Sequence, residues 1–193
     1  SYCGRRAGRA SHQSGLKVLH VRRPDEKEPD GAVWNFPLGW KGQVMLRIML
    51  QKGCGGAEVA LADRLFDPCD DEGQRLAVFR LPLGASRPQA TVAKLQTGRW
   101  HDLCLAWDLD NQRCDVRLNN KPVKSLPQSH PTGNGLHYLR LRSTSQQVDP
   151  NGFLIERVAA HIEDPIAPPR SVAENRRLQQ YYIKHHGGLT PQP

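Results

Sequence analysis

Hydrophobic and polar residues alternate over short stretches along most of the chain, with turn-forming residues between the stretches. The clearest case is residues 100–107 (WHDLCLAW), where Leu103, Leu105 and Trp107 share one face of a two-residue repeat. Such alternation is typical of a β-strand that buries one face. Read in this way, the pattern predicts strands at residues 16–21, 43–51, 57–62, 76–83, 100–107, 113–118, 136–142 and 153–162.

One of these stretches is ambiguous by periodicity alone. Residues 43–51 (QVMLRIMLQ) fit either a helix or a strand. Their short length, the flanking Gly42 and Gly53, and the strands predicted around them favour a strand. Several short strands separated by turn signals about every ten residues are typical of an all-β sandwich.

Both ends of the chain break the strand pattern. Residues 1–15 are rich in Gly, Ser and Arg and predict a basic, flexible N-terminal segment, so the sandwich is expected over residues 16–164. Residues 165–193 begin with prolines and continue into a predicted helix. Ser171 with Glu174 forms a capping box at the start of that helix, and Gly187 and Gly188 follow its end.

Composition limits the kinds of partner. The chain has 193 residues, 38% of them hydrophobic, with a net charge of +8 and a pI near 9.5. No apolar run approaches the roughly 20 residues of a membrane-spanning helix, and no signal peptide is visible at the start. The positive charge favours acidic partners, although a solvated basic surface explains it equally well.

Five cysteines leave at least one thiol free or paired between chains. None shows the C-x-x-C spacing of a zinc site. Cys54 and Cys69 flank one predicted strand, and a disulfide between them is one alternative.

Four segments of the chain resemble a known family. A predicted hairpin is similar to the laminin-G-like or concanavalin-A-like jelly rolls, and it consists of GRWHDLCLAWD (98–108) and CDVRLNNKPV (114–123). The same likeness extends to two later segments, YLRLRS (138–143) and GFLIERV (152–158). The chain also resembles the accessory modules of bacterial sialidase-like, propeller-containing polysaccharide-degrading enzymes. The resemblance implies an antiparallel two-sheet jelly roll that is extracellular, periplasmic or on the cell surface, alongside a catalytic domain of the same polypeptide.

Arginines recur in the middle of the predicted strands, where alternation places them away from the core. If their strands belong to one sheet, they form a basic platform with one tyrosine. The guanidinium fork suits carboxylate and sulfate groups, so the platform predicts an anionic polysaccharide or an acidic protein surface as the ligand. The alternative is that these arginines are solvated or paired with nearby carboxylates. The predicted ligand-binding residues are Arg47, Arg80, Arg117, Tyr138, Arg140 and Arg142.

The loop of residues 63–73 is acidic and offers oxygen ligands of the kind that calcium needs. Its spacing is not that of an EF-hand, and a solvated turn explains the same residues. A structural calcium ion is therefore one prediction for Asp63, Asp67, Asp70 and Asp71.

The sequence carries no motif of a common hydrolase, a phosphate-binding loop or a nucleic-acid-binding fold. Catalysis by this segment alone and nucleic-acid binding are therefore not expected. The sequence favours a non-catalytic carbohydrate-binding or adhesion module of a larger glycan-processing enzyme. A structural module that packs against another domain or subunit is the alternative, and a component of a glycosidase or polysaccharide lyase is a second one.

Overall fold

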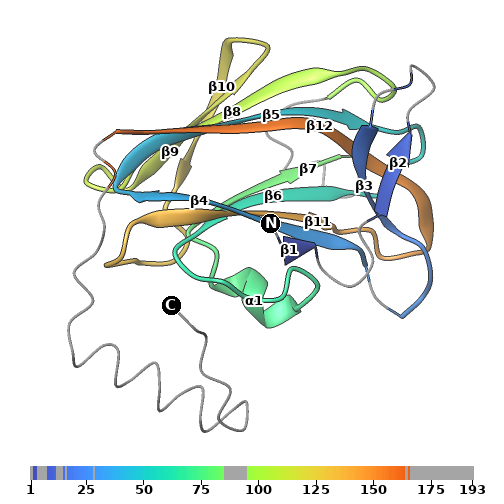
Figure 1. Ribbon diagram of the computed structural model, residues 1–193, viewed down its shortest axis with the longest axis horizontal. Coiled ribbons are helices and arrows are strands. Elements are labelled where there is room, and N and C mark those ends of the chain that lie inside the picture. The colour runs from blue at the N-terminus through green and yellow to red at the C-terminus, as the bar shows by residue number, and fades with distance from the viewer. Residues whose placement is uncertain are drawn as a thin grey trace, which may run out of the picture.

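The computed structural model describes residues 2–3, 8–11, 15, 17–27, 29–84, 95–163 and 165. Over these residues the chain forms two antiparallel β-sheets packed face to face, with one short helix, α1 (Asp71–Arg75), outside them (Figure 1). The all-β, two-sheet architecture that the sequence predicts is therefore confirmed. No helix in this part of the chain is long and apolar enough to cross a membrane.

The first sheet has five strands. Their order is β1 (Tyr2–Cys3), β4 (Gly31–Gly39), β11 (Leu136–Ser143), β6 (Ala57–Ala62) and β7 (Phe79–Leu83). β11 lies at the centre and pairs with β4 on one side and β6 on the other. In this register Arg142 lies opposite both Gly31 and Glu58.

The second sheet has seven strands. Their order is β10 (Lys121–Pro127), β9 (Arg113–Leu118), β8 (His101–Asp108), β5 (Lys41–Leu50), β12 (Asp149–Glu163), β3 (Lys17–Arg23) and β2 (Gly8–Ser11). The predicted hairpin of residues 100–118 is present as β8 and β9. Asn119 and Asn120 follow it with φ angles of 49° and 65°, a left-handed conformation that asparagine tolerates better than most residues.

The hydrophobic core lies between the two sheets. Strands β3 to β12 contribute side chains to it, such as Leu46 and Leu105 from the seven-stranded sheet and Leu139 from the five-stranded sheet. Trp107 packs against Phe36 with ring centroids 5.5 Å apart, and its indole N–H donates to the Gly39 carbonyl over 3.3 Å. Burying each such large apolar side chain contributes about 1.5–3 kcal/mol.

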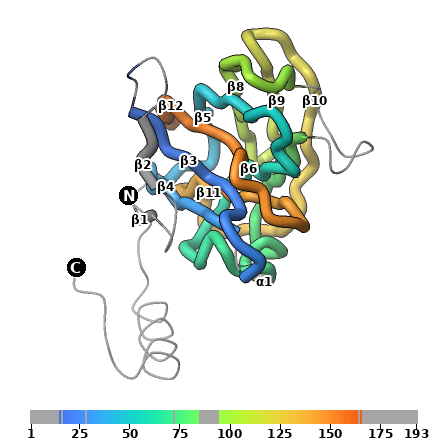
Figure 2. The backbone as a smooth tube through the Cα atoms, turned by 90° about the vertical axis from the view of Figure 1, so that its right-hand side faces the viewer, coloured from blue at the N-terminus to red at the C-terminus, as the bar shows by residue number. Residues whose placement is uncertain are grey.

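A loop with α1 covers part of the outer face of the five-stranded sheet, the face turned away from the core. In two perpendicular views α1 lies on the side of this sheet opposite the seven-stranded sheet (Figure 1, Figure 2). Small residues of the sheet make room for the loop: a Cβ atom on Gly31 would lie 2.7 Å from Pro68. We call residues 63–76 the cover loop.

The structure corrects several details of the sequence prediction. The strand expected at 76–83 is shorter, because α1 and a turn precede β7. Residues 31–39 form a strand, β4, that is not among the strands predicted from the hydrophobic pattern. Residues 2–3 and 8–11 pair with β4 and β3, so the N-terminal segment does not lie wholly outside the sandwich. The predicted C-terminal helix lies outside the described residues.

The disulfide considered for Cys54 and Cys69 is absent. Cys54, Cys104 and Cys114 are free thiols. The Cys69 Sγ instead donates to the carbonyl oxygen of Pro29 over 3.0 Å. Burial raises the pKa of the Cys54 thiol to about 11.

Candidate functional site

A polar groove of about 470 Å³ opens on the outer face of the five-stranded sheet, beside α1. Side chains from β3, β6, β7 and β11, from α1 and from the turn after β11 line it. Charged and amide groups among them are Arg23, Arg80, Arg142, Glu58, Asp71 and Gln74. We refer to this site as the groove.

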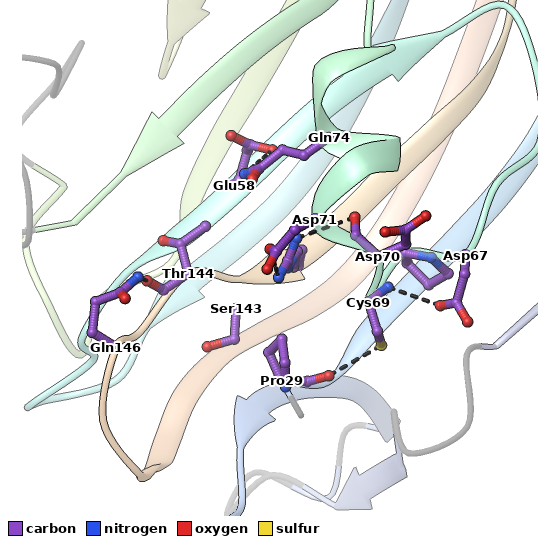
Figure 3. A network of polar contacts seen from close by, with 12 residues as sticks. Pro29, Glu58, Asp67, Cys69, Asp70, Asp71, Gln74, Ser143, Thr144 and Gln146 are labelled. Carbon is purple, nitrogen blue, oxygen red and sulfur yellow. Dashed lines mark hydrogen bonds and ion pairs between the residues drawn. The ribbon is translucent and has the colours of Figure 1, made fainter. Parts of the chain in front are cut away.

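Glu58 is the central acidic group of the groove. Alternation along β6 turns Val59 and Leu61 into the core and leaves Glu58 on the outer face. One carboxylate oxygen accepts hydrogen bonds from Arg80 Nε and Nη2 over 3.1 and 2.8 Å. The other accepts from the Gln74 side-chain amide over 2.9 Å (Figure 3). Glu58 thus fixes a guanidinium and an amide in place on the groove wall.

Arg142 lies on the floor of the groove and is almost fully buried. Its Nη2 donates to the carboxylate of Asp71, the first residue of α1, and its Nη1 donates to the Asp70 carbonyl over 3.3 Å. Its Nε has no hydrogen-bond partner among the described residues. Asp71 and Asp70 lie together where the cover loop enters α1 (Figure 3).

Arg140 fastens the cover loop to the sheet. It is 1% exposed, and its Nη2 donates to the carbonyl oxygens of Asp67, Pro68 and Asp70 over 3.3, 2.8 and 2.7 Å. The guanidinium also lies 5.3 Å from the centroid of the Phe66 ring. Burial, together with the neighbouring Arg142 charge, lowers the pKa of Arg140 to about 10. Arg140 therefore lies beneath the loop, out of reach of a ligand in the groove.

The far end of the groove is formed by β3 and the turn after β11. Arg23 donates to the carbonyl oxygens of Ser145 and Glu26 over 2.9 and 3.0 Å. The Ser145 hydroxyl donates to the Gln147 carbonyl over 2.7 Å, which closes the turn. Thr144 and Gln146 of this turn are joined by a hydrogen bond from the Gln146 amide (Figure 3).

The predicted ligand-binding residues do not form one platform. All five arginines lie on outer faces, as alternation predicts, but they belong to two sheets. Arg47 and Arg117 lie on the seven-stranded sheet, whereas Arg80, Tyr138, Arg140 and Arg142 lie on the five-stranded sheet. The expectation of a single basic face is therefore wrong. Only Arg80 and Arg142 of the six line the groove.

On the seven-stranded sheet, Arg47 is engaged by carboxylates. Its Nε lies 2.7 Å from Glu156 and its Nη1 3.6 Å from Asp102. Arg117 is exposed on β9, opposite Cys104 of β8. On the five-stranded sheet, Tyr138 shares the outer face with Arg140, and its ring centroid lies 4.1 Å from that of His137. A ligand role for these residues stays a prediction.

The acidic side chains of the cover loop have other partners. Asp63 is buried and accepts hydrogen bonds from Arg64 and from the Thr132 hydroxyl, the latter over 2.7 Å. Burial alone raises the pKa of Asp63, but these hydrogen bonds outweigh it and leave the pKa below its ordinary value. Asp67 accepts from the Cys69 backbone N–H over 2.9 Å (Figure 3).

No group of three or more His, Cys, Asp or Glu side chains suited to a metal ion is found within the described ranges. Calcium binding by Asp63, Asp67, Asp70 and Asp71 stays a prediction, which a calcium titration read by thermal unfolding tests.

Sequence reasoning missed Glu58, Gln74 and Arg23 as groove residues. The signal for Glu58 was present, because it is the one charge in the otherwise apolar stretch AEVALA (57–62). Gln74 and Arg23 reach the groove from elements whose placement depends on contacts distant in sequence. Chemically, the groove presents fixed hydrogen-bond donors and acceptors at the surface, an arrangement suited to holding a polar ligand.

Comparisons with known proteins agree on the fold. No protein-family model and no curated protein sequence matches the chain. Among solved structures, a sialidase aligns over 99% of this chain and 19% of its own, with a TM-score of 0.61 and 12% identity. A glycoside hydrolase family 16 endo-glucanase from Bacteroides ovatus aligns over 80% of this chain and 85% of its own, with a TM-score of 0.50 and 12% identity.

These likenesses, at low identity, concern the fold. The described chain is a β-sandwich of the concanavalin-A-like, jelly-roll type, as the resemblance in the sequence implies. It spans about a fifth of the length of the sialidase that it matches.

Proposed function

We propose that this chain is a carbohydrate-binding module whose binding site is the groove on the five-stranded sheet. The observation that carries the proposal is the set of polar side chains held rigidly there, with Glu58 orienting Arg80 and Gln74. Sugars offer many hydroxyl groups, which need donors and acceptors at fixed positions. Groups that are already ordered lose little conformational entropy when a ligand binds.

The two structural neighbours support this proposal because each is named for action on glycans: a sialidase, and an endo-glucanase solved in complex with G4G3G-2F-DNP. The proposed role is binding without catalysis. Both oxygens of Glu58 are occupied by donors of the protein itself, so this carboxylate holds the groove together.

The proposal includes a setting for the module. The chain aligns with a fifth of a sialidase, which fits a module carried beside a catalytic domain in one polypeptide. A binding module in this position holds the catalytic domain near its substrate and raises the effective concentration of that substrate. An extracellular or cell-surface location follows from such a role.

A second candidate is a structural module, and one observation favours it. Met45 is 42% exposed on the outer face of the seven-stranded sheet. In the register it lies opposite Ala159 on β12 and Cys104 on β8, which carry small side chains. This weakly polar area is a surface on which another domain of the same polypeptide can pack.

A glycan array followed by calorimetric titration distinguishes the two candidates. We expect the chain to bind at least one class of oligosaccharide, and Arg80→Ala to weaken that binding by about tenfold or more. Lys124→Ala is the matched control, because Lys124 is an exposed cation on β10 of the other sheet. Thermal unfolding of each variant reports whether the fold is kept.

Three results would count against the groove as the binding site. Equal losses in both variants would indicate a non-specific effect of charge, and loss on Met45→Glu alone would place binding on the seven-stranded sheet. The absence of binding to any glycan would overturn the proposal and leave the structural role.

A further inference from the structure

The ion pair between Arg142 and Asp71 joins a buried cation to an exposed anion. The Arg142 side chain is 8% exposed on the groove floor, whereas the Asp71 side chain is 86% exposed at the start of α1. The Asp71 carboxylate thus reaches into the groove from a side chain otherwise surrounded by water. An exposed side chain can rotate away at little cost, because water replaces the hydrogen bonds that it loses.

The neighbouring pair, Arg80 with Glu58, is different. The Glu58 side chain is 4% exposed and is also held by Gln74. Releasing Glu58 would leave a buried carboxylate without its guanidinium, which is costly. Of these two ion pairs of the groove, only the one at Arg142 can therefore open without burying an unpaired carboxylate.

The charges of the groove favour an acidic ligand once Asp71 turns away. Three guanidinium groups, Arg23, Arg80 and Arg142, line the groove with two carboxylates. When Asp71 is displaced, the three cations face the single carboxylate of Glu58. The net charge of these groups then rises from +1 to +2.

The hydrogen-bonding capacity of Arg142 points to a carboxylate. Its hydrogen bonds to Asp70 and Asp71 use Nη1 and Nη2, while its Nε is buried without a partner in the part of the chain that the structure describes. A carboxylate seated side-on against Nε and Nη2 would satisfy both N–H groups in the two-bond geometry that guanidinium groups favour. Asp71 contacts Nη2 and not Nε, which no described residue satisfies.

We propose that the groove binds an acidic sugar, and that the carboxylate of this sugar displaces Asp71 from Arg142. Asp71 thus occupies the position at which the carboxylate of the ligand binds. This inference rests on the proposed carbohydrate-binding function and adds the ligand class and an internal competitor. Asp71 lowers affinity for acidic glycans, because each binding event must first release it.

The test is calorimetric titration of the full chain with tetragalacturonate, using neutral cellotetraose and a sulfated heparin tetrasaccharide as comparison probes. Asp71→Asn removes the competing charge, so we expect it to bind tetragalacturonate about threefold more tightly than the unchanged protein. Arg142→Gln should weaken this binding about tenfold or more. Arg142→Lys keeps the charge without the fork, and we expect intermediate affinity.

Asp115→Asn is the matched control, because it changes the net charge equally on the outer face of the seven-stranded sheet. It should leave tetragalacturonate affinity within the error of the measurement. Thermal unfolding of Arg142→Gln checks folding. If Arg142→Gln does not fold, the tetragalacturonate affinities of Asp71→Asn and Asp115→Asn still test whether Asp71 competes with the ligand.

The outcomes separate this inference from the function on which it rests. Unchanged or weaker tetragalacturonate binding by Asp71→Asn overturns the inference, and so does binding of cellotetraose alone. In both cases the proposal that the groove binds a glycan is kept. A preference for the heparin fragment that is insensitive to Asp71→Asn also overturns the inference, because Arg142 would then not bind the carboxylate of a ligand in place of Asp71. Binding to none of the probes, nor to any glycan on the array, overturns both.

Discussion

Arg80 of β7 donates two hydrogen bonds to one carboxylate oxygen of Glu58 on β6. The other oxygen of Glu58 accepts from Gln74 of α1. A single buried carboxylate therefore ties two strands and the helix together on the wall of the groove. Its loss should affect both the stability of the fold and the shape of the site.

Glu58→Gln keeps the size of the side chain and removes its charge. We expect it to lower the free energy of unfolding by about 1–2 kcal/mol, since Arg80 is partly exposed and water compensates some of the loss. Urea denaturation at neutral pH measures this change. Asp115→Asn is the control, because its ion pair with Arg113 joins exposed side chains and should change stability by less than about 0.5 kcal/mol. A loss of unfolding free energy in Glu58→Gln as small as that in Asp115→Asn would show that the Glu58 contacts are not stabilising.

Arg140→Met should loosen the cover loop more than it destabilises the whole fold. The substitution removes a donor shared by three backbone carbonyls, but it also removes a charge that burial disfavours, as the lowered pKa indicates. These effects oppose each other, and we expect a net loss of about 1–2 kcal/mol. Hydrogen exchange of the amides at residues 67–72 should accelerate about tenfold, while exchange in β5 and β8 stays unchanged.

Arg75→Met is the matched control for this prediction. Arg75 is exposed at the end of α1, so replacing it changes the same charge on the cover loop without touching the three carbonyls. Unchanged exchange at residues 67–72 in Arg140→Met would contradict the fastening role of Arg140.

Alternation predicted the face of each arginine but not its sheet. Arg47 and Arg142 both follow the rule that polar side chains in a half-buried strand point away from the core. β5 and β11 nevertheless enter different sheets. Sheet membership depends on pairings between strands far apart in sequence, such as β5 with β12, and a local repeat contains no information about them.

The cover loop shows a second limit of the sequence. Its acidic residues indicated either calcium binding or a solvated turn. In the structure, backbone carbonyls of Asp67, Pro68 and Asp70 solvate a buried arginine. Backbone groups are the same at every residue, so side-chain identity could not predict this role. The buried position of Arg140 was missed for the same reason.

Asp63→Asn tests the pH dependence of the fold. The pKa of Asp63 lies below its ordinary value in the folded chain, so its ionised form stabilises the fold at pH values above the pKa of an unfolded aspartate. This contribution is lost as the pH falls through the folded pKa. We expect Asp63→Asn to cost about 1–2 kcal/mol at pH 7. Urea denaturation between pH 7 and pH 3 should show the two proteins converging in acid.

The same series includes Asp102→Asn as a control, because the exposed Asp102 carboxylate lies 3.6 Å from Arg47. This variant should lose little stability at any pH in the range. A gap between Asp63→Asn and the unchanged protein that stays constant down to pH 3 would rule out the ionised Asp63 as its source.

Three of the cysteines should differ in reactivity according to burial. Cys54 and Cys114 are buried and burial raises the pKa of both thiols, whereas Cys104 is partly exposed. Only the thiolate reacts with iodoacetamide, so at pH 8 we expect Cys54 and Cys114 to be modified at least about tenfold more slowly than Cys104. Burial raises the pKa of Cys104 too, but this thiol is less buried than the other two. Mass spectrometry of tryptic peptides measures each rate, and unfolding in guanidinium should make the rates similar. A disulfide-linked peptide joining Cys54 to Cys69 without reductant would contradict the free Cys54 thiol, since this sulfur would then be unable to react.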